Sequence, residues 1–285
     1  MDLGSDRSGG GVGAALTAHE SLSPGWVWSL TWDGAELGHA LIARVFPDFV
    51  LAWPASYEPH EFVSPSFTDR DSEGTPIALW PTRETGIGTH LLSEPVSRVL
   101  SDSDIRRIAA GLDGDTAPDV DWVDQPAPEG FDEDFVLRWA EACFNDGRPL
   151  GAHELFLDER RLKAKGGSAR GLAQTLGLDP ETTRAIFRGE VAVSAEQTAT
   201  LAESLRCAPD DLVGTDPADA LWRKLADPDF KAEVVEASVK SGLSESETRL
   251  AAARAAYALA ARDDGHQRDA QKLHDALRRL YDHDD

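Results

Sequence analysis

The chain is poor in cysteine and lacks any long apolar run. It has two cysteines in 285 residues, Cys143 and Cys207, and two such distant cysteines supply neither a disulfide framework nor a zinc site. No apolar run approaches the roughly 18 residues that a membrane-spanning helix needs. The N-terminus lacks the basic start and apolar core of a signal peptide. We therefore expect a cytoplasmic protein with no membrane partner.

Basic residues are also scarce. The chain has 28 Lys and Arg residues against 51 Asp and Glu residues, which gives a formal net charge of −23. Because binding to phosphates requires cationic surface, this total argues against a nucleic-acid partner. The net charge of the whole chain does not describe a local patch, however. The distribution of the cations therefore decides whether a nucleic acid can bind. The scarcity of lysine beside abundant alanine, aspartate and arginine is typical of a GC-rich bacterial genome.

The length and the changes in composition predict an α+β protein with several parts. Residues 1–20 are rich in glycine and serine and are expected to form a disordered leader. Residues 21–112 are expected to form a small SH3-like β-barrel, and residues 113–132 an acidic linker. An all-α domain is expected over residues 133–214, followed by a helical C-terminal extension over residues 215–285.

The barrel is predicted from short apolar strands separated by Pro, Gly and Asp. Trp26, Trp28, Leu30 and Trp32 alternate with other residues and therefore share one face of a strand. Further strands are expected in LGHALIARVF, DFVLAWPA, IALWP and around residues 90–92. Such strands predict a small barrel or a curled sheet. A helix at 105–112, capped by the Ser/Asp residues that precede it, is expected to close this unit.

The acidic linker and the helices after it are predicted from composition and capping signals. Residues 113–137 contain nine acidic residues and no basic one, which is typical of a solvated arm. Ser244 and Glu247 form a capping box. Helices are expected over residues 135–144, 153–165, 168–176, 180–188, 194–206, 228–241, a stretch following 244, and 266–283, the last with Leu273, Leu277 and Leu280 on one side.

The strongest motif lies between residues 168 and 214. Gly177 suits the left-handed conformation that ends a helix, Asp179 can cap the next helix, and Pro180 occupies its first position. Residues expected to face a common core are Leu172, Ala173, Ile186, Leu201, Ala202, Leu205 and Leu212. Two short helices joined by a tight glycine turn form the shape that places its second helix in the major groove of DNA.

This arrangement resembles the Cro/CI-type (XRE) helix-turn-helix family over residues 153–214. The matching residues are Leu172-Ala173, Leu176-Gly177, Asp179, Ile186, Arg188-Gly189, Ser194, Leu201-Ala202, Leu205 and Leu212. The resemblance implies a compact five-helix domain that binds double-stranded DNA, of the kind found in repressors and antitoxins. It also implies a homodimer that binds two half-sites.

The local charge agrees with this interpretation. Residues 159–188 contain seven basic and three acidic residues, a basic window in an acidic chain. The expected phosphate-binding residues are Arg160, Arg161, Lys163, Lys165, Arg170 and Arg188. The expected base-reading residues are Glu181, Thr182, Thr183 and Arg184. Pro180 and Ala185 carry no hydrogen-bonding side chain, so the alternatives are a solvated helix surface or a protein-binding module.

The order of features in residues 24–112 resembles the MazF/PemK toxin barrel family, whose members cleave RNA. The likeness lies in the Gly-Trp-Val-Trp strand, the paired apolar strands that follow, the THLLSEPVSRVL stretch and the closing helix. Where the family has an Arg-Pro pair this chain reads Gly38-His39-Ala40, and where it has a threonine this chain reads Pro54-Ala55-Ser56. Metal-independent RNA cleavage needs a base for the 2′-hydroxyl and a cation for the phosphorane. The residues available for these two roles are His39, His60, Arg44 and Arg83.

We therefore predict a sequence-specific DNA-binding transcriptional regulator with no catalytic residue, no metal and no cofactor. The pairs His60-Glu61 and His153-Glu154 lack the second histidine of a zinc-binding helix. One alternative is an endoribonuclease of the MazF/PemK type. Another is a catalytically inactive barrel that acts as a protein-interaction module, with a toxin or a regulator as its partner.

Overall fold

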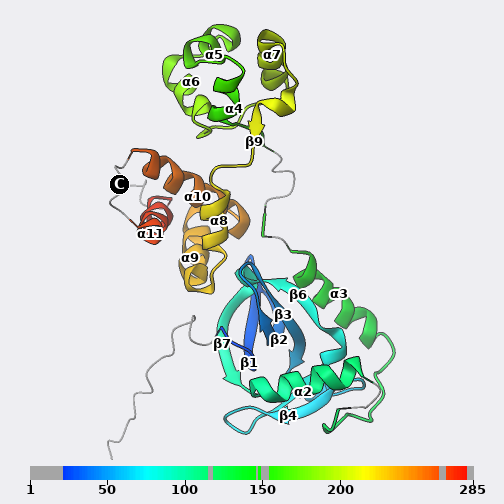
Figure 1. Ribbon diagram of the computed structural model, residues 1–285. Coiled ribbons are helices and arrows are strands. Elements are labelled where there is room, and N and C mark those ends of the chain that lie inside the picture. The colour runs from blue at the N-terminus through cyan, green and yellow to red at the C-terminus, as the bar shows by residue number, and fades with distance from the viewer. Residues whose placement is uncertain (1–21, 115–117, 146, 149–153, 263–267, 281–285) are drawn as a thin grey trace, which may run out of the picture.

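A computed structural model describes residues 22–114, 118–145, 147–148, 154–262 and 268–280. It is a mixed α+β structure in which a curled antiparallel half-barrel sheet is followed by a helical region (Figure 1). The expected α+β class is therefore confirmed at this level. The expected leader over residues 1–20 lies outside the described residues. No helix of the described part is long and apolar enough to cross a membrane.

The sheet contains seven antiparallel strands in the order β4-β5-β3-β2-β1-β7, and β6 also pairs with β3. β3 bends because its outer edge pairs first with β6, from Phe49 to Ala52, and then with β5, at Ala55 and Ser56. This switch of partner curls the sheet. The strands are β1 (Trp26–Trp32), β2 (Ala35–Val45), β3 (Phe49–Ser56), β4 (Phe67–Arg70), β5 (Pro76–Leu79), β6 (Thr85–Gly88) and β7 (Leu92–Arg98).

The alternation predicted for the first strand is present in β1. Trp28 and Leu30 are fully buried on one face of the sheet, with Trp26 and Trp32 packed against the same cluster. Val27, on the other face, is buried in a second cluster with Ile105 and Ile108 of α2 (Asp102–Asp113). The predicted cap of this helix is also present, since Ser101 and Asp104 form a capping box. The strand expected at residues 90–92 is instead a 3-10 turn, η3 (Thr89–Leu91), and β7 begins at its end.

The acidic segment after α2 is not a free arm where the structure describes it. The backbone of residues 120–125 runs beside the segment that leads into β4, with Ser64 N–H donating to Gln125 O at 2.8 Å and Val123 N–H donating to Ser66 O at 2.9 Å. Trp122 packs edge-on against Phe67. The prediction of a solvated linker is therefore wrong for these residues. Their acidic side chains alternate with apolar side chains that pack against the sheet, and their backbone covers an open strand edge.

Helix α3 (Phe131–Phe144) also belongs with the sheet. Ala142, Trp139 and Cys143 pack in the cluster of Trp28 and Leu30, and Phe135 packs against Trp80. The sequence analysis placed this helix in the all-α domain over residues 133–214. Its apolar side chains instead cover one face of the sheet, so the change of structural unit follows α3.

Residues 154–214 form a small helical unit closed by a short two-stranded ladder. The strand β8 (Phe156–Leu157) pairs with β9 (Val213–Gly214), which brings the two ends of the unit together. The helix expected over residues 153–165 is therefore shorter, because Leu155 and β8 are extended and Asp158 caps α4. The helices between the strands are α4 (Glu159–Ala164), α5 (Ala169–Leu176), α6 (Pro180–Phe187), α7 (Ala195–Leu205) and the 3-10 turn η4 (Pro209–Asp211).

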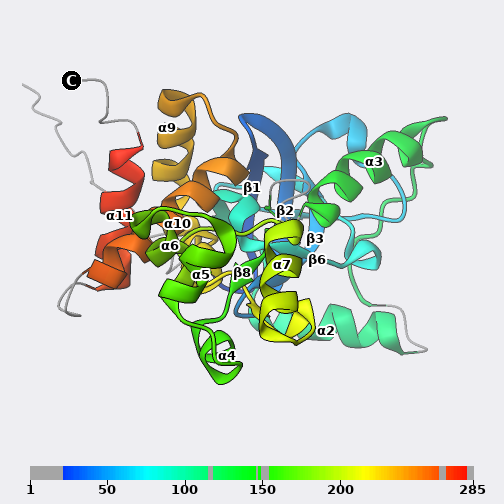
Figure 2. The same cartoon turned by 90° about the horizontal axis from the view of Figure 1, so that it is seen from above.

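The C-terminal helices form one bundle. Leu273 and Leu277 of α11 are buried with Val234 of α9 and Leu225 of α8, as the predicted apolar stripe on the last helix requires. The helices are α8 (Asp219–Leu225), α9 (Lys231–Ser241), α10 (Glu245–Arg262) and α11 (Asp269–Arg279), with the 3-10 turn η5 (Pro228–Phe230) before α9. The bundle lies between the helical unit and the sheet (Figure 1). Seen from above, α11 and α3 lie on opposite sides of the molecule (Figure 2).

A buried ionic cluster joins the bundle to the hairpin between β1 and β2. Nζ of Lys231 donates to Glu245 Oε2 at 2.7 Å and to Thr31 O at 2.8 Å. Asp33 N–H donates to Glu245 Oε1, and Glu245 N–H donates to Asp33 Oδ1. Arg249 is 0% exposed and lies 3.5 Å from Glu245. The cluster holds the sheet and the bundle in one arrangement.

Candidate functional site

Local capping determines the geometry of the α5–α6 pair. Ser168 Oγ accepts a hydrogen bond from Gly171 N–H at 3.1 Å, which starts α5. Gly177 has φ +65° and ends the helix, as a left-handed residue at this position does. Asp179 Oδ1 then accepts from Glu181 N–H and Thr182 N–H, both at 2.9 Å, which starts α6. Hydrogen bonds, first from Thr182, lower the pKa of Asp179. The cap is therefore an ionised carboxylate at neutral pH.

The predicted core of the unit is also present. Leu172, Ile186, Leu201, Ala202 and Leu212 are all 2% exposed or less. Thr183, which was predicted to read bases, is buried with them, and its hydroxyl donates to Asp179 O at 2.6 Å. Thr183 precedes Ile186 by one helical turn and so shares its inward face. Its assignment as a base-reading residue is wrong.

The six predicted phosphate-binding residues differ in their surroundings. Arg161 donates to Val213 O at 2.7 Å and lies 3.7 Å from Asp158, so it closes the ends of the unit. Lys163 and Lys165 pair with Glu159 at 2.6 Å and Asp211 at 2.9 Å. Asp211 raises the pKa of Lys165.

The remaining predicted cations are more available to an external partner than Arg161, Lys163 and Lys165. Arg188 lies 3.6 Å from Glu190 at the end of α6. Arg160, Arg170 and Arg184 are exposed, and among the described residues no carboxylate pairs with them. These three arginines therefore keep their full charge for a partner, whereas Arg161, Lys163 and Lys165 are partly neutralised.

The outer side of α6 begins with Glu181, which is exposed, and Thr182, which is half-buried. Arg184 follows one turn later on the exposed side. The other end of the helix contacts the bundle, because the Tyr257 hydroxyl of α10 donates to Arg188 O at 3.3 Å. The first turn of α6 is therefore the end that lies away from this contact.

A second candidate site is a groove of about 140 Å³ beside α3, where β2 begins and β3 ends. It joins the two segments that carry the departures from the toxin-barrel pattern, since His39 of β2 lies opposite Ala55 of β3 in the sheet register. Tyr57 packs edge-on against His39, with 5.3 Å between ring centroids. Arg138 of α3 lines the same groove and pairs with Glu61 at 2.5 Å.

The groove holds a neutral imidazole beside a guanidinium. Burial lowers the pKa of His39, although Glu36 opposes this shift, so the ring is uncharged at neutral pH. Burial also raises the pKa of Tyr57. Burial alone raises the pKa of Glu61, but hydrogen bonds from Ser56 and Arg138 outweigh it and lower the pKa. The carboxylate therefore stays charged and holds Arg138 at the groove.

Of the four residues considered for RNA cleavage, the structure places only His39 in this groove. The side chain of His60 is 75% exposed and lies near Glu58. Arg44 is exposed on β2, and Arg83 lies over the ring of Phe135. Tyr57 and Arg138 were not predicted from the sequence. Arg138 comes from a helix far along the chain from β2, and no local pattern links the two.

The groups of His, Cys, Asp and Glu in the described ranges include none that could hold a metal ion. His153 of the pair His153-Glu154 lies outside these ranges. In comparisons with known proteins, no family model, no curated protein and no solved structure matches the chain.

Proposed function

We propose that residues 154–214 bind double-stranded DNA as a helix-turn-helix of the Cro/CI type and that the protein is a transcriptional regulator. One observation carries this proposal: α6 follows a left-handed glycine turn after α5, and the pair is accompanied by exposed arginines for which the described residues provide no carboxylate partner. The second helix of such a pair enters the major groove with its first residues toward the bases. The first turn of α6 lies away from the bundle contact, in keeping with this role.

In this proposal the contribution of each cation to phosphate binding depends on its acidic neighbours. Arg160 and Arg170 make the main phosphate contacts, because no carboxylate in the described part of the chain competes for them. Lys163, Lys165 and Arg188 contribute less, since each has an acidic neighbour. Thr182 and Arg184 reach the base edges, while Glu181 accepts from a cytosine amino group. A homodimer binds two half-sites of an operator.

The test compares the salt dependence of DNA binding by two triple variants. The full chain is titrated with genomic DNA fragments at 50 and 150 mM salt. Replacing Arg160, Arg170 and Arg184 with alanine removes two phosphate contacts and the arginine at the base edges, and the slope of log K against log salt falls by about 0.9 for each phosphate contact. The matched control replaces three exposed arginines of the sheet unit, Arg44, Arg70 and Arg106.

The proposal predicts that the wild type and the control bind with similar, steep slopes. The helical-unit variant loses affinity and most of the slope. No binding by the wild type at low salt, or an equal loss in the two triple variants, overturns the proposal. The second outcome shows that only the total charge matters.

We propose metal-independent RNA cleavage as a second candidate function, because one groove holds a neutral base and a cation. His39 takes the proton of a 2′-hydroxyl, whose oxygen attacks the adjacent phosphorus while the bond to the 5′-oxygen breaks. The 5′-oxygen takes a proton from water, which leaves a 2′,3′-cyclic phosphate and a 5′-hydroxyl. Arg138 stabilises the charge that develops on the phosphorane. The full chain is incubated with an RNA ladder in the presence of a chelator. We expect cleavage by the wild type and by His60→Ala, and none by His39→Ala. An intact ladder with the wild type removes this candidate.

A further inference from the structure

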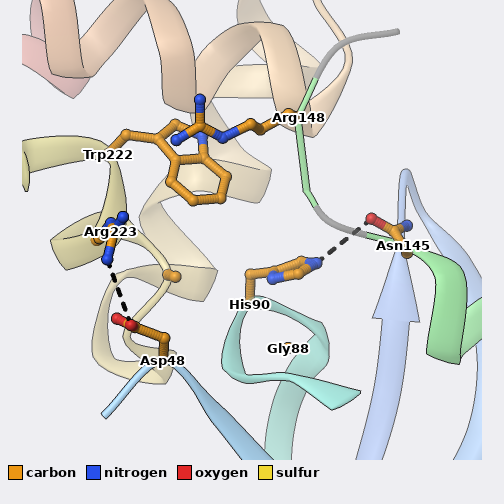
Figure 3. Close-up of a pocket in the computed structure, with 8 residues that line it drawn as sticks. Asp48, Gly88, His90, Asn145, Arg148, Trp222 and Arg223 are labelled. Carbon is orange, nitrogen blue, oxygen red and sulfur yellow. Dashed lines mark hydrogen bonds and ion pairs between the residues drawn. The ribbon is translucent and has the colours of Figure 1, made fainter. Parts of the chain in front are cut away.

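A cavity of about 370 Å³ lies where the sheet, the end of α3 and the bundle meet (Figure 3). Trp222 and Arg223 of α8 line one side, His90 and Gly88 line another, and Arg148 lies over the indole with its guanidinium carbon 4.5 Å from the ring centroid. This volume is within the range of small-molecule sites, which often form at boundaries between structural units. The site is separate from both sites described above.

The walls of the cavity are held in place. Nε2 of His90 lies 3.3 Å from Asn145 Oδ1, which also accepts from Gly147 N–H at 2.9 Å. A Cβ at Gly88 would lie 2.2 Å from the His90 ring, and one at Gly147 would lie 3.0 Å from it. The imidazole therefore occupies a slot that two glycines make possible. Lys231 and Glu245 join the sheet and the bundle nearby, so the two walls form one preformed site.

The lining of the cavity carries more positive than negative charge. Arg148 and Arg223 provide two positive charges to it, and Asp48 provides one negative charge. Asp219, which lies outside the lining, pairs with both arginines and is 3.0 Å from Nε of Arg223. The Arg223–Asp48 pair is 3.4 Å long, and both side chains are more than half exposed. Such an exposed pair contributes little, so Arg223 can exchange Asp48 for a ligand oxygen at small cost.

Trp222, which lines the cavity, also has a buried donor that lacks an acceptor in the described part of the chain. Nε1 of Trp222 is shielded from solvent, and nothing in the described part of the chain accepts its hydrogen bond. A buried N–H without a partner is costly and is rare in native proteins. An acceptor oxygen on a ligand removes this cost, and the indole offers a flat apolar surface beside it.

We propose that this cavity binds a small organic acid with a planar ring, with its oxyanion at Arg223 and its ring against Trp222. An aromatic carboxylate and a nucleoside monophosphate share this chemistry. The cavity residues come from both the sheet unit and the bundle, so the ligand bridges them. Binding is measured without DNA, so its failure leaves the proposed DNA function untouched.

The experiment is a calorimetric titration of the full chain with benzoate, with adenosine monophosphate and with inorganic phosphate. We expect one of the two ring-bearing probes to bind more tightly than phosphate. Arg223→Gln weakens that binding by roughly tenfold or more, as loss of a charge-assisted hydrogen bond does. Asp48→Asn strengthens it by roughly two- to fivefold, because a competing rim carboxylate is removed.

Two further variants separate the site from general effects. Trp222→Phe keeps a ring in the wall but removes the N–H, so binding weakens while the melting temperature changes little. Lys224→Gln is the matched control, since Lys224 is the next residue of α8 and pairs with Asp269 outside the cavity. It leaves binding unchanged. The proposal is overturned if neither ring-bearing probe binds, if phosphate alone binds as tightly, or if Lys224→Gln weakens binding as much as Arg223→Gln.

Discussion

The buried cluster around Glu245 gives the sharpest prediction about stability. The carboxylate of Glu245 is 1% exposed and faces two cations, Lys231 at 2.7 Å and Arg249 at 3.5 Å. Burial lowers the pKa of Lys231 and lowers the pKa of Arg249 to about 10, so both cations depend on this carboxylate. Glu245→Gln keeps the shape and the acceptor for Asp33 N–H but removes the negative charge.

The expected loss follows from burial. Removal of one partner from a buried ion pair costs about 3–5 kcal/mol, because the remaining charge is left without compensation in a poorly solvated place. The bundle offers a matched comparison in Glu236, which pairs with Lys240 at 2.6 Å, nearly the same distance, but with both side chains about half exposed. Exposed pairs contribute about 0.2–1 kcal/mol. Glu236→Gln should therefore lower the free energy of unfolding by less than about 1 kcal/mol.

The assay is urea unfolding of the full chain, followed by circular dichroism, for both variants and for the double variant Lys231→Met/Glu245→Gln. The double variant should recover at least about 1 kcal/mol of the loss, because it no longer buries the uncompensated ammonium. Two results refute the reasoning. One is an equal loss in Glu245→Gln and Glu236→Gln, and the other is a double variant that is no more stable than Glu245→Gln.

Three further predictions concern the α5–α6 pair and the groove. Gly177→Ala should lower the free energy of unfolding by about 1–2 kcal/mol, because φ is +65°. This loss comes from backbone strain alone, since no atom lies within 4 Å of an added Cβ. In the same urea titration, Gly177→Asn should lower the free energy of unfolding by less. Asp179→Ala should cost about 1 kcal/mol by loss of the helix cap, and Asp179→Ser should restore most of it. The folded state holds the pKa of His39 below its unfolded value of about 6.5. The unfolded state therefore binds more protons near that pH. As a result, the free energy of unfolding falls as the pH is lowered through 6.5. His39→Gln should remove this part of the slope between pH 7 and 5, and equal slopes in the two proteins would contradict the assignment.

Local signals in the sequence were sufficient for much of the fold. Ser101 and Ser244 cap the helices that their capping patterns predicted, because a cap depends on residues three positions apart. Gly177 and Gly242 end α5 and α9 in the left-handed conformation, as glycine permits. The alternation of β1 also identified the correct apolar face.

Features that depend on distant partners were missed. The acidic segment and α3 were assigned by composition and position, but Trp122 and Trp139 bury on sheet residues far away in the sequence. The groove residues Tyr57 and Arg138 meet only because α3 folds back on the sheet. Thr183 is a different case, since its spacing to Ile186 already indicated the inward face. The spacing of Thr183 to Ile186 predicted burial, but Thr183 was assigned a base-reading role from its position in the motif.

The net charge of −23 now has a structural consequence for the proposed DNA contact. Arg254 of α10 pairs with Glu154 and Asp216. Burial raises the pKa of Tyr257 on the same helix, and the acids Glu190, Glu159 and Asp216 add to this shift. Several acids near the helical unit therefore lie toward the bundle, away from the surface that is proposed to contact DNA. A duplex that meets the exposed arginines and the first turn of α6 avoids these acids, whereas other approaches meet acidic surface. We therefore expect the proposed DNA contact to form in few orientations, with binding that is weak and strongly dependent on salt.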